Sequence, residues 1–155
     1  MSFEDIYKEY WQKVYRVCMG YVNDHDWAKD IAQETFISVF QQISNFRNES
    51  SIGTWIYRIS VNHCLRQIEK NKKIIKTPFQ IDIVDEQQPN FEDKITFLYK
   101  SISELPETER IIISLELENV KQAEIAIILG LSETNVRVKI HRIKQKLTQK
   151  FKRYE

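Results

Sequence analysis

Apolar residues recur every three or four positions along most of this chain of 155 residues, and that spacing predicts helices rather than strands. Three such segments make up the first half of the chain, at residues 3–21, 28–43 and 52–73. The polar stretch Ser44–Ser51, between the second and third segments, predicts a loop. The first half is therefore expected to fold as three helices.

The pattern changes after the third segment. From residue 77 the helical spacing disappears, and two prolines with a run of acidic residues take its place. This composition predicts a flexible acidic linker at residues 75–92. Helical spacing returns at Phe91, and further helices are expected at residues 106–117, 121–129 and 133–151. We therefore predict an all-α protein of two small helical domains, residues 1–74 and 93–155.

Composition supports this fold class, because 3 Gly and 3 Pro provide few turns for a β-rich or alternating fold. Cys18 and Cys64 lie in apolar helical segments and are expected to be buried free thiols in a reducing cytosol. No apolar run approaches about 18 residues, and the N-terminus lacks the basic start of a signal peptide. We expect a cytoplasmic protein without membrane insertion.

The net charge of +1 conceals a segregated pattern. Residues 51–80 carry six basic residues against one acidic, and residues 119–155 carry nine against three. Residues 81–118 carry ten acidic residues against three basic. Two basic blocks are typical of two separate surfaces for a polyanion such as nucleic acid. Ordinary solvated helix faces carry similar runs, so charge alone leaves both interpretations open.

A helix-turn-helix pattern occupies the second basic block. Glu124–Leu129 predicts a helix, Gly130 can adopt a left-handed turn, and Ser132 can cap the next helix. The polar face of that helix and its flanks comprise Thr134, Asn135, Arg137, Val138, Lys139, His141, Arg142 and Gln145. Such a helix suits insertion into a DNA major groove. The alternative is a basic amphipathic helix that packs on its domain and carries charge only for solubility. A repressor or a response-regulator output domain would carry the same motif, so the motif alone indicates only that the protein binds DNA.

One face of the second predicted helix is acidic and amide-rich rather than basic. It combines carboxylates, amides and one isoleucine away from the apolar stripe: Asp30, Gln33, Glu34, Ile37 and Gln41. This combination fits a partner surface rich in arginine, where bidentate pairs with carboxylates can form. An ordinary solvated face is the alternative.

Aromatic and cationic residues combine in the loop and the third helix. They are Phe46 and Arg47 in the loop, with Trp55, Arg58, Asn62, Arg66 and Lys70 on the helix. Aromatic rings stack on unpaired bases and cations follow the phosphates, so this set predicts a surface for single-stranded DNA. A tryptophan at this spacing is more often a core residue, which is the second interpretation of Trp55.

These motifs, in this order, resemble one protein family. Asp30–Phe36 resembles the conserved second-region helix of bacterial sigma factors, and Asn45–Arg47 with Thr54–Asn62 resembles its third subregion. Leu105–Glu107 and Glu124–Arg142 are similar to region four. The resemblance covers nearly the whole chain except the linker. Nothing resembles regions one and three, which points to the extracytoplasmic-function (ECF) class of the sigma-70 family.

The resemblance implies that residues 1–74 are sigma region 2 and residues 93–155 are region 4. Region 2 would bind the β′ clamp helices of core RNA polymerase through the second-helix face. It would also melt the promoter −10 element, with the 44–51 loop capturing a flipped base whose edge Asn48 could read. Region 4 would bind the −35 element through the last helix and contact the β flap. The same resemblance implies control by an anti-sigma factor.

The chain departs from the family pattern at several DNA-facing positions. Lys121 and Gln122 stand where members commonly have a serine or threonine and an aromatic residue, so lysine is expected to contact phosphate there. Val138 and His141 replace a small polar residue and an aromatic residue. The base preference at −35 is therefore not transferable.

No catalytic or metal site is predicted, and no cofactor. Three histidines are scattered over separate elements, and neither a glycine-rich phosphate loop nor a nucleophile elbow is present. Two alternatives to a sigma factor remain. One is a helix-turn-helix regulator that binds duplex DNA without polymerase. The other is an adaptor that binds no DNA, which leaves both basic blocks unexplained.

Overall fold

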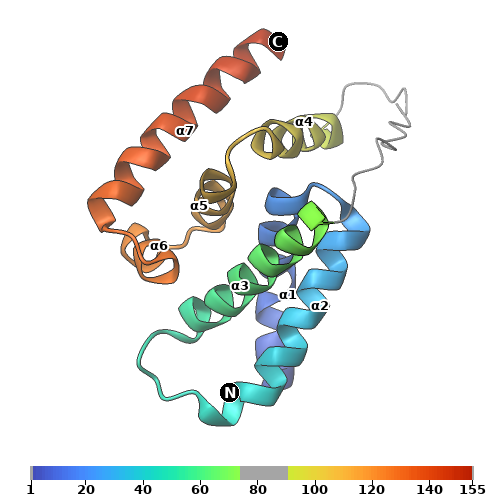
Figure 1. Ribbon diagram of the computed structural model, residues 1–155, viewed down its shortest axis with the longest axis vertical. Helices are drawn as coiled ribbons and strands as arrows, with labels where there is room; N and C mark the ends of the chain where they lie inside the picture. Colours follow the sequence, from blue (N-terminus) through green and yellow to red (C-terminus); the bar gives the residue numbers. More distant parts are fainter. Residues whose placement is uncertain (1, 74–90, 155) are drawn as a thin grey trace.

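The computed structural model describes residues 2–73 and 91–154, and every regular element in these ranges is a helix (Figure 1). The N-terminal domain contains α1 (Phe3–Val22), α2 (His25–Gln42), the short 3-10 helix η1 (Ile43–Asn45) and α3 (Ile52–Lys73). The C-terminal domain contains α4 (Phe91–Ser103), α5 (Glu107–Leu117), α6 (Gln122–Leu129) and α7 (Glu133–Tyr154). The all-α prediction is confirmed.

Local side-chain chemistry explains where the first two helices begin and end. Ser2 and Asp5 form a capping box at the start of α1, with Asp5 N–H donating to Ser2 Oγ at 3.2 Å. Asn23 ends α1 in the left-handed conformation with φ 50°, and its N–H donates to the carbonyl of Met19. Asp24 then caps α2 by accepting a hydrogen bond from Trp27 N–H at 2.8 Å.

Several predicted boundaries shift by a few residues. Pro106 is the N-cap of α5 rather than its first helical residue, and Lys121 is likewise the N-cap of α6. Helix α7 continues to Tyr154, beyond the predicted end at Phe151. Ile43 belongs to η1 and is half-buried, whereas it was expected inside the second helix.

The predicted linker lies mostly outside the described residues. Its last two positions, 91 and 92, are already the first residues of α4. Among the described helices, none is both long and apolar enough to cross a membrane.

The cores of the two domains form one continuous cluster of buried side chains. The largest fully buried residues come from both halves of the chain, among them Ile6, Ile31 and Ile56 from the first half and Ile112, Ile125 and Ile143 from the second. Helix α1 packs against α4 and α5, and α3 packs against α6 (Figure 1). The two domains are therefore in direct contact, with α6 beside α3.

The two cysteines are free and buried, as predicted, but they also meet. Cys64 Sγ lies 3.8 Å from Cys18 Sγ between α1 and α3. Sequence separation gave no sign of this proximity. The neighbouring thiol and complete burial raise the pKa of Cys64 well above its usual value.

Candidate nucleic-acid and polymerase interfaces

The helix-turn-helix forms as its sequence predicts. Gly130 ends α6 in the left-handed conformation with φ 68°, and the next residue's N–H donates to the carbonyl of Ala126 at 3.0 Å. Ser132 then caps α7 by accepting a hydrogen bond from Asn135 N–H at 3.1 Å. Ile125 and Ala126 are buried between the helices, so the turn fixes α7 on the domain.

The exposed face of α7 is the predicted one. Its buried stripe consists of Val136, Ile140, Ile143 and Leu147. Seven of the eight residues predicted for this face and its flanks are exposed, and Lys139 is half-buried. The exposed ones are Thr134, Asn135, Arg137, Val138, His141, Arg142 and Gln145. At the start of α6, Lys121 is exposed and Gln122 is half-buried. The structure thus brings these residues onto one helix-turn-helix surface.

Ion pairs neutralise three lysines in the second half of α7, and no pattern in the sequence indicated these pairs. In its second half, Lys150 Nζ lies 2.7 Å from Glu104, and Lys146 and Lys144 reach carboxylates of α5 at 3.4 and 3.6 Å. The hydrogen bond to Lys150 lowers the pKa of Glu104. Within the described residues, Arg137 and Arg142 in the first half form no ion pair. The cations nearest the helix-turn-helix are therefore not neutralised by carboxylates of the described residues, whereas three lysines of the second half are.

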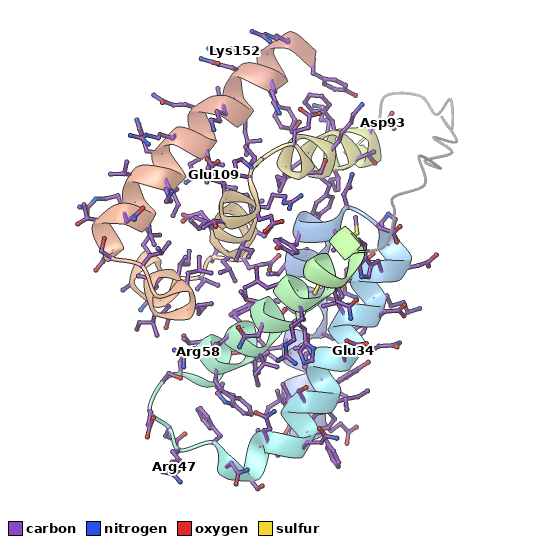
Figure 2. The ribbon with its side chains drawn as sticks, in the orientation of Figure 1. Glu34, Arg47, Arg58, Asp93, Glu109 and Lys152 are labelled. Atoms are coloured by element: carbon purple, nitrogen blue, oxygen red, sulfur yellow. The ribbon has the colours of Figure 1, made fainter. Side chains whose placement is uncertain are left out.

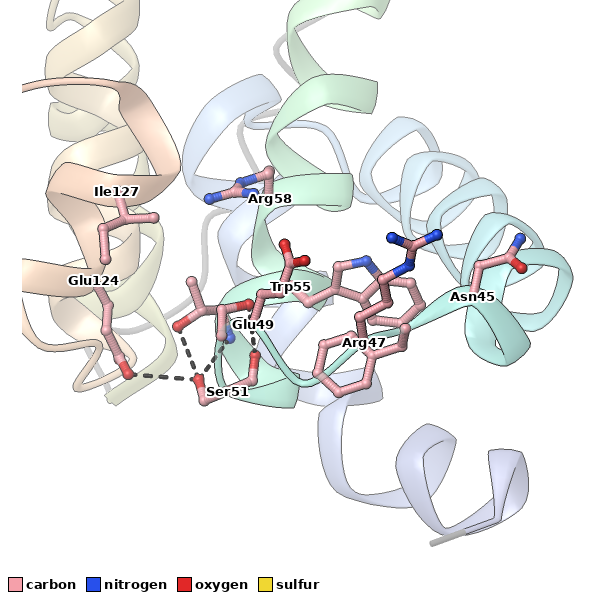
Figure 3. Close-up of a pocket in the computed structure, with 11 residues that line it drawn as sticks. Asn45, Arg47, Glu49, Ser51, Trp55, Arg58, Glu124 and Ile127 are labelled. Atoms are coloured by element: carbon pink, nitrogen blue, oxygen red, sulfur yellow. Dashed lines mark hydrogen bonds between the residues drawn. The ribbon is translucent and has the colours of Figure 1, made fainter.

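A cavity of about 480 Å³ lies between the loop after η1 and the start of α3 (Figure 3). Four of the predicted DNA-binding residues line it: Phe46, Arg47, Trp55 and Arg58. The ring of Phe46 packs against that of Trp55, with centroids 5.0 Å apart. Trp55 is half-buried and packs against the core, which supports the second interpretation in part, and its contact with DNA stays a prediction.

The other predicted residues of this surface lie outside the cavity. Asn48 is exposed in the loop, where it adopts a left-handed conformation with φ 58°. Asn62 and Arg66 are exposed farther along α3, so the basic surface continues beyond the cavity. The side chain of Lys70 lies outside the described part of the chain.

Two further residues that line the cavity come from the other domain and were not predicted. Glu124 and Ile127 of α6 line the same cavity, and Ser51 Oγ donates to Glu124 Oε1 at 3.4 Å (Figure 3). Ser51 also receives a hydrogen bond from Thr54 N–H at 3.2 Å, which fixes the start of α3. No pattern along the chain could reveal this contact, because Ser51 and Glu124 are separated by 73 positions.

The face of α2 predicted to bind a partner is fully exposed. Asp30, Gln33, Glu34 and Ile37 all face solvent, and Ile37 keeps 58% of its surface exposed. Phe40, which was not predicted, is 63% exposed and lies at the same end of the helix. Its ring contacts Phe3 of α1 with centroids 5.1 Å apart. An apolar patch therefore adjoins the acidic face.

Two residues of α3 contact Glu34, which Figure 2 labels on α2. Gln67 Nε2 donates to Glu34 Oε2 at 3.3 Å, and His63 Nδ1 lies 3.8 Å from the same oxygen. His63 Nε2 also lies 2.8 Å from Ser38 Oγ. Burial, followed by the charge of Arg66, lowers the pKa of His63. Among the described residues, no group of histidine, cysteine or carboxylate side chains is arranged to hold a metal ion.

An apolar groove on the C-terminal domain lies between α5 and α7. It is lined by Ile113, Leu117, Leu147 and Phe151 with flanking polar residues, and it encloses about 420 Å³. Leu117 keeps 48% of its surface exposed there. The groove is on a different part of this domain from the exposed face of α7.

Comparisons with known proteins agree in both halves of the chain. Residues 6–74 match the family model of Sigma-70 region 2, and residues 98–147 match that of Sigma-70, region 4. The chain is 31% identical over 134 residues to RNA polymerase sigma factor SigV of Bacillus subtilis, covering 84% of this chain and 80% of that protein. It is 27% identical to ECF RNA polymerase sigma factor SigM of the same species, covering 99% of this chain and 97% of the relative.

Two solved structures share the fold. The sigma factor RpoE of Bartonella quintana, in complex with the anti-sigma factor NepR, superposes with a TM-score of 0.78 at 17% identity, covering 97% of this chain and 96% of that one. CnrH, in complex with the cytosolic domain of CnrY, gives a TM-score of 0.75 at 17% identity, covering 99% and 89%.

Proposed function

The chain belongs to the extracytoplasmic-function subfamily of sigma-70 RNA polymerase sigma factors, and from this premise we propose which of its surfaces carry each step of initiation. As a sigma factor it acts in promoter recognition and transcription initiation. We propose that it does so as an initiation factor and not as an enzyme. We assign residues 1–74 to polymerase and −10 binding and residues 93–155 to −35 binding.

The exposed face of α2 is assigned to core polymerase. Asp30 and Glu34 can form paired hydrogen bonds with arginine, and Glu34 is already oriented by Gln67. Ile37 and Phe40 supply apolar area beside them, the usual composition of an interface centre. The β′ clamp helices are the proposed partner, as the family resemblance implies.

The cavity beside α3 is assigned to the opened −10 element. It places two aromatic rings and the guanidinium groups of Arg47 and Arg58 around a space of about 480 Å³, enough for one unpaired base. Asn62 and Arg66 extend a polar and basic track along α3 for the adjacent strand. This cavity, where stacking and charge converge, is the observation that supports the proposal most directly.

The first half of α7 is assigned to duplex −35 DNA. Its cations form no ion pair with any residue that the structure describes, and Val138 is exposed at its centre. The apolar groove between α5 and α7 is assigned to the β flap, since it is open and lies away from the DNA-facing side. No cofactor is required for any of these roles.

An anti-sigma factor is the proposed regulator, and the cytoplasm is the proposed compartment because polymerase and chromosome reside there. The decisive experiment is run-off transcription with core polymerase over a promoter library. Promoter-specific transcripts that require this chain support the assignment. Tight duplex DNA binding with no polymerase association would instead favour a helix-turn-helix regulator.

A further inference from the structure

Two side chains of α3 contact the carboxylate of Glu34, which lies on the face of α2 assigned to core polymerase. We infer that these two residues, Gln67 and His63, are positioning residues for polymerase binding. Gln67 holds the carboxylate in place while the His63 ring is neutral, and a protonated His63 binds the carboxylate in competition with the polymerase. This inference rests on the proposed function for the identity of the partner, and on contacts within the N-terminal domain for its structure.

The two contacts of Glu34 differ in kind. Gln67 Nε2 lies 3.3 Å from Glu34 Oε2, which is within hydrogen-bonding distance. His63 Nδ1 lies 3.8 Å from the same oxygen, which is too far for a hydrogen bond. The Glu34 side chain nevertheless keeps 48% of its surface exposed. The carboxylate is therefore held by one uncharged donor and remains accessible to a partner.

An uncharged donor is suited to a carboxylate that must bind a cation elsewhere. The amide of Gln67 does not cancel the charge of Glu34, and a carboxylate has lone pairs left for a second donor such as arginine. A side chain that is already held also loses less conformational freedom when the partner binds. Gln67 should therefore favour polymerase binding although it lies on a different helix from the assigned face.

Ser38 determines which nitrogen of the neutral His63 ring carries the proton. Its Oγ lies 2.8 Å from His63 Nε2. A neutral imidazole has one N–H group, a carboxylate only accepts, and a hydroxyl can donate or accept. Both contacts are satisfied when Ser38 donates to Nε2 and the proton sits on Nδ1. The neutral ring thus has its N–H on the nitrogen nearest Glu34, and only the distance prevents a hydrogen bond.

Protonation of His63 would change the partner of Glu34. The charged ring donates from both nitrogens, and the Ser38 hydroxyl can rotate to accept. A charge-assisted hydrogen bond is about 2.7–2.9 Å long, so a movement of roughly 1 Å is enough to form one with Glu34. The carboxylate is then paired with a cation of its own chain. An arginine of the partner must displace that cation before it can bind.

The surroundings of His63 keep the ring neutral under ordinary conditions. Burial lowers the pKa of His63, the charge of Arg66 on the same helix lowers it further, and the charge of Glu34 on α2 raises it. The resulting pKa lies below the ordinary value of 6.5, so the carboxylate is available to a partner at pH 7.5. An arginine bound at Glu34 would bring more positive charge to the ring. Polymerase binding and protonation of His63 therefore oppose each other.

Titration of the His63 ring by NMR tests these contacts on the full chain without polymerase. The chain has 3 histidines, and His63→Gln identifies the signal. Glu34→Gln removes the carboxylate charge and should lower the pKa of His63 further. Gln67→Leu releases the carboxylate toward the ring and should raise it. Gln12→Leu, which changes an exposed amide on α1, is the matched control. An unchanged pKa in both test variants would overturn the inference.

The affinity for core polymerase tests the functional consequence. At pH 7.5, Gln67→Leu should weaken binding severalfold, whereas Gln12→Leu should match wild type. Between pH 7.5 and pH 5.5 the wild-type protein should lose affinity as the neutral fraction of His63 falls. Because the pKa lies below 6.5, this loss is at most about tenfold.

His63→Gln separates this effect from titration of the polymerase itself. Glutamine keeps a donor at this position but cannot become charged, so the variant should lose less affinity than wild type over the same pH range. Circular dichroism at pH 5.5 should show that both proteins remain folded. Equal losses for the two proteins, together with unchanged binding by Gln67→Leu at pH 7.5, would overturn the inference.

Reversal of the face itself distinguishes this inference from the proposed function. If Asp30→Arg combined with Glu34→Arg still binds core polymerase, the assignment of this face fails, while the NMR titration still decides whether Gln67 and His63 share the carboxylate. If the reversed protein loses binding but the Gln67 and His63 variants match wild type at both pH values, the face is retained and the positioning role fails.

Discussion

The ring of Phe46 packs against the ring of Trp55 with centroids 5.0 Å apart, which joins the loop after η1 to the first turn of α3. Phe46 thus stands between the core and the cavity assigned to the −10 element.

Phe46→Ala should reduce promoter opening by about ten- to hundredfold, because stacking on one base contributes roughly 1–3 kcal/mol. Arg47→Ala should act in the same direction. Permanganate reactivity of −10 thymines in the polymerase complex measures opening, and full melting in both variants would contradict the assignment. Duplex −35 binding is the internal control and should not change.

Charge reversal on α2 should disrupt polymerase binding without unfolding the domain. Asp30→Arg combined with Glu34→Arg should abolish capture of core polymerase in a pull-down, because the exposed carboxylates would become like charges facing arginine. Circular dichroism should remain that of wild type. Glu9→Arg, an exposed acidic position on α1, is the matched control and should retain binding. Full capture of the double variant would exclude this face.

The first half of α7 should determine the preferred −35 sequence. If Arg142 reads a guanine, Arg142→Ala should cost about 1–3 kcal/mol and relax preference at one position. If Arg142 contacts phosphate, affinity should fall equally for all sequences and the salt dependence should decrease by about one unit. Val138→Ser should weaken binding only where a thymine methyl faces it. Selection from randomised −35 DNA tests both variants, and an unchanged preferred sequence in each would show that this helix is not the reader.

Gly130 is required for its backbone conformation rather than for space. Its φ of 68° is left-handed, and a Cβ there would meet no atom within 4 Å. Gly130→Ala should therefore lower the free energy of unfolding by about 1–2 kcal/mol. Gly130→Asn should cost less, because asparagine tolerates this region. Urea unfolding followed by circular dichroism compares the two, and equal losses would contradict a purely conformational requirement.

His63 should make the N-terminal domain sensitive to acid. Burial and the charge of Arg66 hold the pKa of His63 below its ordinary value of 6.5, so folding favours the neutral ring. Its contribution to stability is present above pH 6.5 and is lost as the pH falls through the folded-state pKa. The midpoint of thermal unfolding should fall from pH 7.5 to pH 5, and His63→Gln should reduce that dependence. An identical pH profile for the variant would assign the effect to other groups.

The sequence was sufficient to predict features that depend on local chemistry. The break between the first two helices follows from Asn23 and Asp24, and the helix-turn-helix follows from Gly130 and Ser132, because turn and cap preferences act over a few residues. Helical spacing correctly separated the buried stripe of α7 from its exposed face. The roles of individual residues in DNA and polymerase binding remain predictions.

Features that depend on which surfaces meet could not be predicted. The spacing of apolar residues shows that a residue is buried, but it does not show which residue it packs against. The approach of Cys18 to Cys64 was therefore not predicted. The pairing of Lys150 with Glu104, which neutralises part of the basic block, was equally hidden. The close approach of Gly20 to Ser114 of α5 was hidden in the same way.

The carboxylate of Glu124, which lines the same cavity as Arg47 and Arg58, has a consequence at the scale of the chromosome. Non-specific sites on a genome number about 10⁶–10⁹, and they attract any open basic surface. A scarce initiation factor with such a surface would be held on the chromosome and withdrawn from the pool available to polymerase. Glu124 places a negative charge at the cavity that Arg47 and Arg58 line, which weakens the attraction of that surface for such sites. Occupancy of chromosomal DNA by the free factor should thus be low, and its search for polymerase correspondingly fast.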